Sequence, residues 1–253
     1  MKFWKYTSAG NDFVIFEEEF LVNKKLVPKI SDRRFGIGAD GVLVFKKSEN
    51  LDFEMVYFNA DGGEVEMCGN GARALCHFAK FIKGIDKKNL KFKTLNGIYA
   101  AEFCEDNIIK MAMSEVRSPK LSLENLCPKN SGYYEVGVPH VVLFGLDYDE
   151  LLAKKIRHDK RFKNGTNVNF VKIISENKFE IRTFERGVEA ETLACGTGIT
   201  ASGIFLMDKK IATNNSVEII AKGGNFSVDF ENGTFFLTGT TQLVFSGELI
   251  NMG

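Results

Sequence analysis

The chain contains an internal repeat. The segments Cys68-Gly69-Asn70-Gly71 and Cys195-Gly196-Thr197-Gly198 lie 127 residues apart (195 − 68), which is half the length of a 253-residue protein. The same spacing relates three further pairs: Arg34-Phe35 with Arg161-Phe162, Gly97 with Gly224, and Phe103 with Phe230. The second half is therefore predicted to be a copy of the first, with one cysteine at the same place in each half.

The two halves also show the same order of expected elements. In the first half we expect a strand at 12–17, a helix at 27–35, strands at 41–46 and 53–58, a helix after Cys68, and strands at 90–94, 99–103 and 108–113. In the second half the counterparts are a strand at 140–144, a helix at 148–162, strands at 167–174 and 179–184, a helix after Cys195, and strands at 216–221, 226–230 and 234–238. Residues 242–250 are expected to form one extra strand.

The helices that follow the two cysteines are apolar on nearly all sides, and such helices are usually buried. This predicts an α+β fold of two pseudo-symmetric domains, each a curved mixed or antiparallel β-sheet or barrel wrapped round a central buried helix. We expect residues 1–114 to form the N-terminal domain, completed by a strand at 242–253, and residues 115–241 to form the C-terminal domain. The junction is expected near residues 114–126.

Composition excludes several classes of function. Lys plus Arg and Asp plus Glu both number 33, so the net charge is zero and nucleic acid is not an expected partner. No apolar stretch approaches the roughly 20 residues of a membrane span, and no apolar segment follows Met1, so we expect a cytoplasmic protein without a membrane anchor. The five cysteines lack the spacing of a zinc site, so we expect thiols and no metal.

The position of the two cysteines predicts their chemistry. A helix N-terminus favours thiolate over thiol, and its unpaired backbone N–H groups can bind an anion. The glycines of both segments lack Cβ atoms, so a ligand can approach the backbone closely. If the two domains faced each other across one cleft, a carboxylate held by both helix ends would have one sulfur on each face of its α-carbon. Removal of a proton from one face and delivery of another to the opposite face would invert that carbon.

A single Cys-Gly pair before a helix is more often structural than catalytic. The second copy in register strengthens the catalytic interpretation for Cys68 and Cys195. Cys76, Cys104 and Cys127 lack that context, and we expect them to be core or surface residues.

The chain resembles diaminopimelate epimerases along nearly its whole length. The resemblance is carried by the following segments: Gly10-Asn11-Asp12-Phe13, Gly36-Ile37-Gly38-Ala39-Asp40-Gly41, Asn59-Ala60-Asp61-Gly62, Cys68-Gly69-Asn70-Gly71-Ala72-Arg73, Pro139-His140, Asn167, Glu185-Arg186-Gly187, and Glu191-Thr192-Leu193-Ala194-Cys195-Gly196-Thr197-Gly198. The resemblance implies interconversion of LL- and meso-diaminopimelate by two cysteines without a cofactor, on the route to lysine and peptidoglycan. It also implies the family's fold and a homodimer.

The resemblance also assigns roles. Cys68 and Cys195 match the acid–base pair. The backbone that would bind the reacting carboxylate matches at Gly69, Asn70, Gly196 and Thr197. Side chains that would bind the substrate match at Asn11, Asn59, Asn167 and Arg186. His140 and Glu185 match residues that shift the pKa values of the thiols, and Glu185 also counts among the substrate contacts. Arg186 suits bidentate carboxylate binding, although an average Arg more often forms a surface salt bridge.

Two positions depart from the family pattern. The family commonly has Asn where this chain has Val138, which removes one substrate contact, while its repeat mate Asn11 is retained (138 − 11 = 127). The family's usual Asp-Gly-Ser becomes Asp61-Gly62-Gly63. Neither change replaces Cys68 or Cys195.

Three other functions compete with this interpretation. A proline racemase-like enzyme would share the duplicated fold and both cysteines, but that family typically has His where this chain has Asn70. A phenazine-biosynthesis-like isomerase would share the fold but lack the cysteine pair. A non-catalytic redox sensor, with a reversible disulfide between Cys68 and Cys195, would not need the polar ligand residues.

Overall fold

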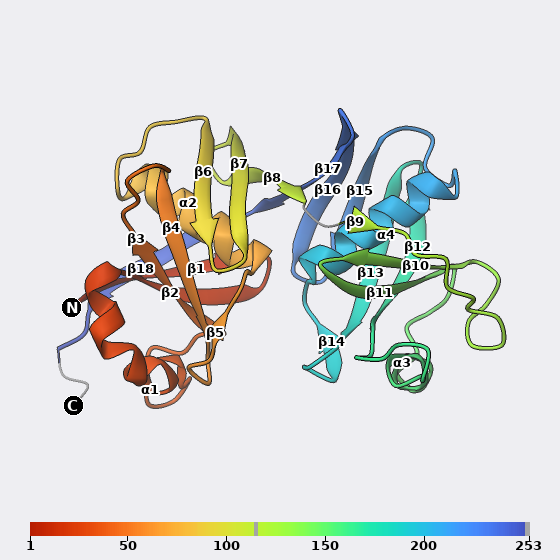
Figure 1. The fold of residues 1–253 in the computed structure, drawn as a ribbon, viewed down its shortest axis with the longest axis horizontal. Helices are drawn as coiled ribbons and strands as arrows, with labels where there is room; N and C mark the ends of the chain where they lie inside the picture. Colours follow the sequence, from red (N-terminus) through yellow and green to blue (C-terminus); the bar gives the residue numbers. More distant parts are fainter. Residues whose placement is uncertain (114–115, 251–253) are drawn as a thin grey trace. The chain divides into compact units, whose positions relative to one another are not determined.

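The structure is a computed structural model and describes residues 1–113 and 116–250. The chain divides into two compact units, Met1–Met111 with the segment from Gly239 onward, and Ala112–Thr238. The expected boundary between residues 114 and 115 falls outside the described residues. Each unit consists largely of strands around a buried helix of 13 residues, which confirms the predicted α+β fold (Figure 1).

The first unit begins and ends with paired strands. Its strands are β1 (Lys2–Ser8), β2 (Asn11–Glu17), β3 (Gly41–Lys46), β4 (Phe53–Asn59), β5 (Glu64–Val65), β6 (Asn89–Thr94), β7 (Gly97–Glu105), β8 (Ile108–Met113) and β18 (Gln242–Glu248). Its helices are the 3-10 helix η1 (Glu18–Leu26), α1 (Val27–Ser31) and α2 (Gly69–Phe81). Because β18 pairs antiparallel with β1, the last described strand is part of the same unit as the first.

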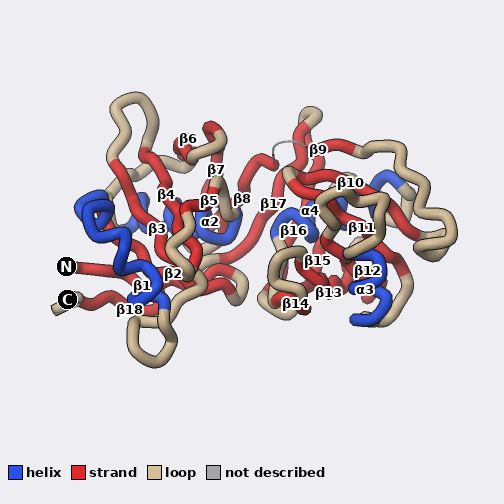
Figure 2. Tube along the Cα trace, turned by 60° about the horizontal axis from the view of Figure 1, so that its bottom comes forward, coloured by secondary structure: helices blue, strands red, loops and turns tan. Residues whose placement is uncertain are grey.

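The second unit repeats this order of elements. Its strands are β9 (Val116–Arg117), β10 (Ser131–Val136), β11 (Val138–Phe144), β12 (Asn167–Ser175), β13 (Lys178–Glu185), β14 (Ala190–Thr192), β15 (Ser216–Ala221), β16 (Gly224–Glu231) and β17 (Thr234–Thr240). Its helices are α3 (Glu150–Arg157), which lies against β12 and β13, and α4 (Gly196–Asp208) (Figure 2).

The strand pairing shows that the repeat extends to topology. In the first unit β2 is parallel to β3, β3 is antiparallel to β4, and β4 is parallel to β6. In the second unit the pairs β11–β12, β12–β13 and β13–β15 follow the same pattern. Each parallel pair requires a crossover. In the first unit η1 and α1 connect β2 to β3, and α2 lies between β4 and β6. In the second unit α3 connects β11 to β12, and α4 lies between β13 and β15.

Strand β2 shows why the apolar runs of the sequence are continuous. Phe13 and Ile15 pack in a core with α2, while the alternate residues Val14 and Phe16 pack in a second core with α1. Both faces of the strand are therefore covered, and a strand buried on both faces has no polar alternation. Phenylalanine fills much of the first core, with Phe53 and Phe92 stacked at 4.9 Å between ring centroids.

Five strands and the ends of two helices differ from the sequence-based expectation. The expected elements include neither β1 nor β10, the first full strand of each unit, and they omit the short strands β5, β9 and β14. In β1 the charge of Lys5 interrupts the apolar pattern, although its ammonium is buried against Asp12 at 2.6 Å. Helix α1 ends at Ser31 because the Asp32 carboxylate accepts the backbone N–H groups of the next turn. Helix α3 begins at Glu150 because Asp149 caps it.

Candidate active site

Each of the two repeated cysteines is the N-cap of a buried helix. Cys68 precedes α2 with φ −134° and ψ 117°, and Cys195 precedes α4 with φ −113° and ψ 105°. Their carbonyl oxygens accept the first helical N–H groups, from Ala72 at 2.8 Å and Ile199 at 2.9 Å. Cys68 is partly exposed and Cys195 is buried, and all five cysteines of the chain are thiols. Each sulfur thus lies at the positive end of a helix dipole.

The glycines after each cysteine have two different functions. A Cβ on Gly69 would meet nothing within 4 Å, so the backbone there can be approached, whereas one on Gly196 would be in tight contact with Leu237 at 3.2 Å. A Cβ on Gly71 would lie 3.0 Å from Leu43, and one on Gly198 only 2.4 Å from Asn169. This corrects the sequence argument: the second glycine of each segment lets the helix pack on its sheet.

A chain of hydrogen bonds runs from Cys195 into the core of the second unit. Cys195 Sγ lies 3.5 Å from Thr197 Oγ1, which lies 3.0 Å from His140 Nε2. The other ring nitrogen, Nδ1, lies 3.3 Å from the side-chain nitrogen of Asn169. Burial, together with the positive charge of Arg186, lowers the pKa of His140 to about 3, so the imidazole is neutral at neutral pH. Three sequence-distant elements, β11, β12 and the start of α4, supply this chain.

A different polar group lies behind Cys68. The guanidinium of Arg73 is fully buried in α2 and donates to Asn70 Oδ1. Burial lowers the pKa of Arg73 to about 10, which still leaves Arg73 a cation at neutral pH. Sequence reasoning did not assign Arg73 a role, although a charged residue inside an otherwise apolar helix signals one.

Asn11 is held from two sides. Its Oδ1 accepts from Asn70 Nδ2 at 2.5 Å, and its Nδ2 donates to Asp40 Oδ2 at 3.0 Å. Arg33 bridges Asp40 and Asp12 at 2.7 Å each. Burial raises the pKa of Asp12, but its hydrogen bonds with Arg33 and Lys5 outweigh burial and lower it to about 2. The segment around Asn11 is thereby fixed to the start of α2.

Asn167, Glu185 and Arg186 meet at one corner of the second unit. Asn167 donates to the Pro139 carbonyl at 3.0 Å and accepts from the backbone N–H of Arg186 at 2.8 Å. Burial raises the pKa of Glu185, while a hydrogen bond from Thr192 at 2.8 Å partly offsets that rise. The Arg186 side chain is half-buried and donates to the Asn164 carbonyl at 3.3 Å. Asn167 therefore joins the start of β11 to the residue after β13.

Asn59 ends β4 in the first unit. Its backbone N–H donates to Gly63 and its carbonyl accepts from Gly62, both at 2.9 Å, and Gly62 has a φ of +89° that suits glycine. The Asn59 side chain is exposed. The segment that carries Asn59 is thus a tight turn, which presents that side chain at the end of the strand.

Two other kinds of site are absent from the described residues. There, no three His, Cys, Asp or Glu side chains gather in a way that could hold a metal ion. In the same part of the chain, no helix has the length and apolar character needed to cross a membrane.

The chain is similar to proteins of known class along its whole length. The family model for diaminopimelate epimerase matches residues 3–118 and 132–244. Diaminopimelate epimerase from Flavobacterium psychrophilum is 38% identical and covers 97% of this chain and 98% of its own. The enzyme of the same name from Campylobacter jejuni is 39% identical, with 97% of each chain covered.

Solved structures at low identity share the fold. A predicted epimerase from Pseudomonas aeruginosa has a TM-score of 0.73 at 13% identity and covers 99% of both chains. A hydroxyproline epimerase from Agrobacterium vitis has a TM-score of 0.66 at 13% identity and covers 98% of this chain and 91% of its own.

The match to the family model and to the full-length relatives shows that this chain is an isomerase of the racemase and epimerase class. Within that class the family model and the full-length relatives decide the family. The chain belongs to the diaminopimelate epimerase family.

Proposed function

We propose that this chain interconverts LL- and meso-diaminopimelate by proton transfer between substrate and two cysteines, Cys68 and Cys195. The observation that carries the proposal is that each cysteine caps the N-terminus of a buried helix. A helix N-terminus stabilises an adjacent anion by about 0.3–1 kcal/mol, and by up to about 2 kcal/mol when partly buried. It therefore supports both the thiolate and the negative charge that develops on the substrate.

In the proposed reaction one cysteine is a thiolate and the other a thiol. The thiolate takes the α-proton, so that an S–H bond forms, the Cα–H bond breaks, and the electron pair moves toward the α-carboxylate. The other thiol then delivers its proton to the opposite face of the same carbon and becomes the thiolate. Exchange of both sulfurs with solvent resets the pair, and no electron enters or leaves.

The backbone N–H groups at Gly69, Asn70, Gly196 and Thr197 are proposed to hold the reacting carboxylate. The open space beside Gly69 supports this role. Its effect would be largest in the transition state, because the carboxylate gains negative charge when the proton leaves.

Groups further from the sulfurs are proposed to bind the rest of the substrate. Arg186, Asn59 and Asn167 would bind the distal amino-acid end, and Asn11 would contact the reacting end. The Asn167 side chain already donates one N–H and accepts one N–H in hydrogen bonds with backbone groups. Its second N–H and its second lone pair would therefore bind the substrate. Glu185 and His140 would tune the thiols, His140 in its neutral form.

A homodimer in the cytoplasm is the proposed working form, on the basis of the family resemblance alone. Size-exclusion chromatography with light scattering tests the oligomeric state. A monomer at micromolar concentration that retains full activity would contradict the dimer.

An epimerisation assay tests the substrate, with diaminopimelate and proline compared under the same conditions. Diaminopimelate should be converted and proline should not. Conversion of proline alone would replace the proposal with a proline racemase-like activity.

Cysteine variants test the catalytic pair. Cys68→Ser and Cys195→Ser should each lose about 100-fold or more in kcat, because removal of one acid–base group costs roughly that factor. Cys104→Ser is the matched control, since Cys104 is exposed on β7, and its activity should equal that of the unmodified chain. Full activity in either Cys68→Ser or Cys195→Ser would reject the two-cysteine mechanism.

A further inference from the structure

The side-chain amide of Asn169 has one possible orientation. Its nitrogen lies 3.0 Å from the Val141 carbonyl oxygen and 3.3 Å from His140 Nδ1, while its oxygen accepts from Thr183 Oγ1 at 2.9 Å. A flipped amide would place its oxygen against the Val141 carbonyl, and two acceptors cannot form a hydrogen bond. The Val141 carbonyl therefore determines which end of the Asn169 amide faces His140.

This orientation determines the tautomer of His140. Because the Asn169 nitrogen only donates, His140 Nδ1 must accept, and the single proton of the neutral ring is on Nε2. Nε2–H then donates to Thr197 Oγ1 at 3.0 Å. Since the Thr197 oxygen accepts that bond, its own proton is available to Cys195 Sγ at 3.5 Å.

We propose that Asn169 is a positioning residue that fixes His140 as the Nε2–H tautomer and so directs the Thr197 hydroxyl proton toward Cys195 Sγ. This deepens the proposed function and rests on it for its catalytic meaning. A thiolate gains more from a hydroxyl donor than a thiol does, because hydrogen bonds to charged groups are the stronger ones. Asn169 would thus favour the reactive form of Cys195 without touching substrate.

The internal repeat shows that this relay is specific to the Cys195 half. His140 and Asn169 correspond to Phe13 (140 − 13 = 127) and to Leu43 (169 − 43 = 126), since Phe13 pairs with Gly41 as His140 pairs with Asn167. A Cβ on Gly71 would meet Leu43, just as one on Gly198 would meet Asn169. The same helix packing is therefore achieved with apolar residues in the first unit, so packing alone does not require Asn169.

Nitrogen NMR of the intact protein tests the tautomer without substrate. The chain has three histidines, so the His140 ring can be assigned by comparison with a His140→Phe variant. The ring should show a protonated Nε2 and an unprotonated, accepting Nδ1 at neutral pH. A proton on Nδ1 in the unmodified protein would overturn the proposal, because the tautomer is read from the unmodified protein and the variant serves only for assignment.

Variants then test the role of Asn169. Asn169→Leu copies the first unit and should give a mixture of His140 tautomers. At pH 7 its Cys195 should react with iodoacetamide about tenfold more slowly, as expected for the loss of one hydrogen bond to a charged group. Alkylation of Cys68 in the same sample, followed by peptide mass spectrometry, is the internal reference and should be unchanged.

Thr183→Val is the matched control. It removes a hydrogen bond to the same amide but leaves the Val141 carbonyl in place, so the His140 tautomer and the Cys195 reaction rate should both be retained. An Asn169→Leu variant with the original tautomer and Cys195 reactivity would refute the positioning role. Because neither readout requires turnover, failure of the epimerase proposal would be seen separately, as absent conversion of diaminopimelate with the tautomer intact.

Discussion

Asn70 donates its side-chain N–H to Oδ1 of Asn11 over 2.5 Å, which ties the first turn of α2 to the start of β2. The same Asn70 accepts from the buried guanidinium of Arg73. One side chain thus connects the buried charge behind Cys68 to a residue that we propose contacts substrate.

Asn70→Ala should therefore affect both stability and activity. The buried Arg73 loses an acceptor, which should cost about 1–3 kcal/mol of unfolding free energy in urea titrations. Asn11 loses one of its two anchors, so kcat/KM for diaminopimelate should fall as well. Unchanged unfolding free energy would show that Arg73 does not depend on this contact.

The packing of α4 on β16 predicts a stability difference between two helical glycines. A Cβ on Gly203 would lie 2.7 Å from Val228 Cβ, whereas one on Gly69 would meet nothing within 4 Å. Gly203→Ala should destabilise the protein by about 1–3 kcal/mol through overpacking. Gly69→Ala should be neutral or gain up to about 1 kcal/mol, because Ala is the better helix former. Equal urea midpoints would contradict the close approach at Gly203.

The buried neutral His140 predicts a pH dependence of stability. Burial lowers its pKa from an ordinary value of 6.5 to about 3, so between these values the unfolded chain binds more protons than the folded one. Stability should be fully present above about pH 6.5 and should fall as the pH falls toward 3.

A His140→Phe variant isolates this contribution, because Phe13 fills the matching position in the first unit. Between pH 7 and 4.5 the unmodified protein should lose roughly 2 kcal/mol more than the variant. Urea unfolding at several pH values measures the difference, since the carboxylates titrate in both proteins and cancel. Parallel pH profiles would show that His140 can be protonated inside the fold.

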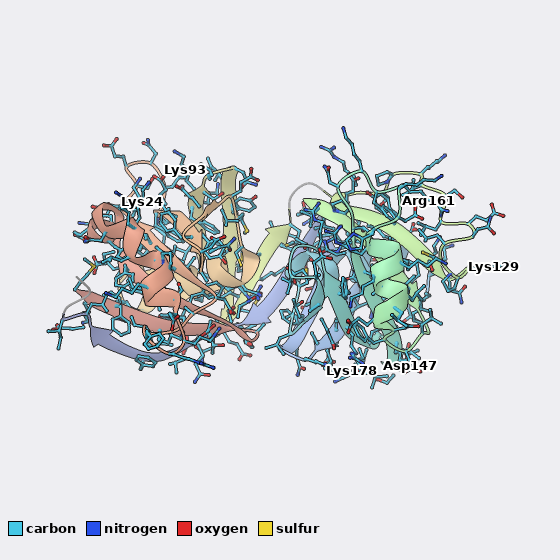
Figure 3. All side chains as sticks on the ribbon, turned by 90° about the horizontal axis from the view of Figure 1, so that it is seen from below. Lys24, Lys93, Lys129, Asp147, Arg161 and Lys178 are labelled. Carbon is cyan, nitrogen blue, oxygen red and sulfur yellow. The ribbon has the colours of Figure 1, made fainter. Side chains whose placement is uncertain are left out.

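Arg186 is proposed to position the distal end of the substrate. Arg186→Ala should raise KM for diaminopimelate and also lower kcat, because distal binding holds the reacting carbon in place. Arg161→Ala is the control, since Arg161 is exposed on the surface of the second unit (Figure 3). If Arg186→Ala and Arg161→Ala gave the same kinetic constants, Arg186 would have no part in substrate binding.

The fold could be predicted from the sequence because the duplication is visible in it. Two cysteines at a spacing of 127 residues, each before an apolar helix, indicated the repeat, and their helices begin directly after them. The strand β1 was missed because Lys5 breaks its apolar pattern. Its burial is explained by contacts with Asp12 on the neighbouring strand and with the Gly38 carbonyl.

Part of the site could not be predicted from spacing. The relay from Cys195 joins side chains from β11, β12 and α4, and its geometry depends on which carbonyl faces the Asn169 amide. A buried Asn in an apolar strand is a weak signal in sequence, because its partners are distant along the chain. Residue roles that came from the family resemblance remain predictions for the experiments above.

Isotope incorporation tests the central claim most directly. LL-diaminopimelate is incubated in heavy water with the reduced protein, and both isomers are analysed by mass spectrometry at early times. The two-cysteine mechanism predicts one deuterium at the α-carbon of the meso product, while the recovered LL substrate still carries its original hydrogen. Equal labelling of both isomers would indicate a single acid–base group, and product without deuterium would contradict delivery of the new hydrogen by a second thiol that exchanges with solvent.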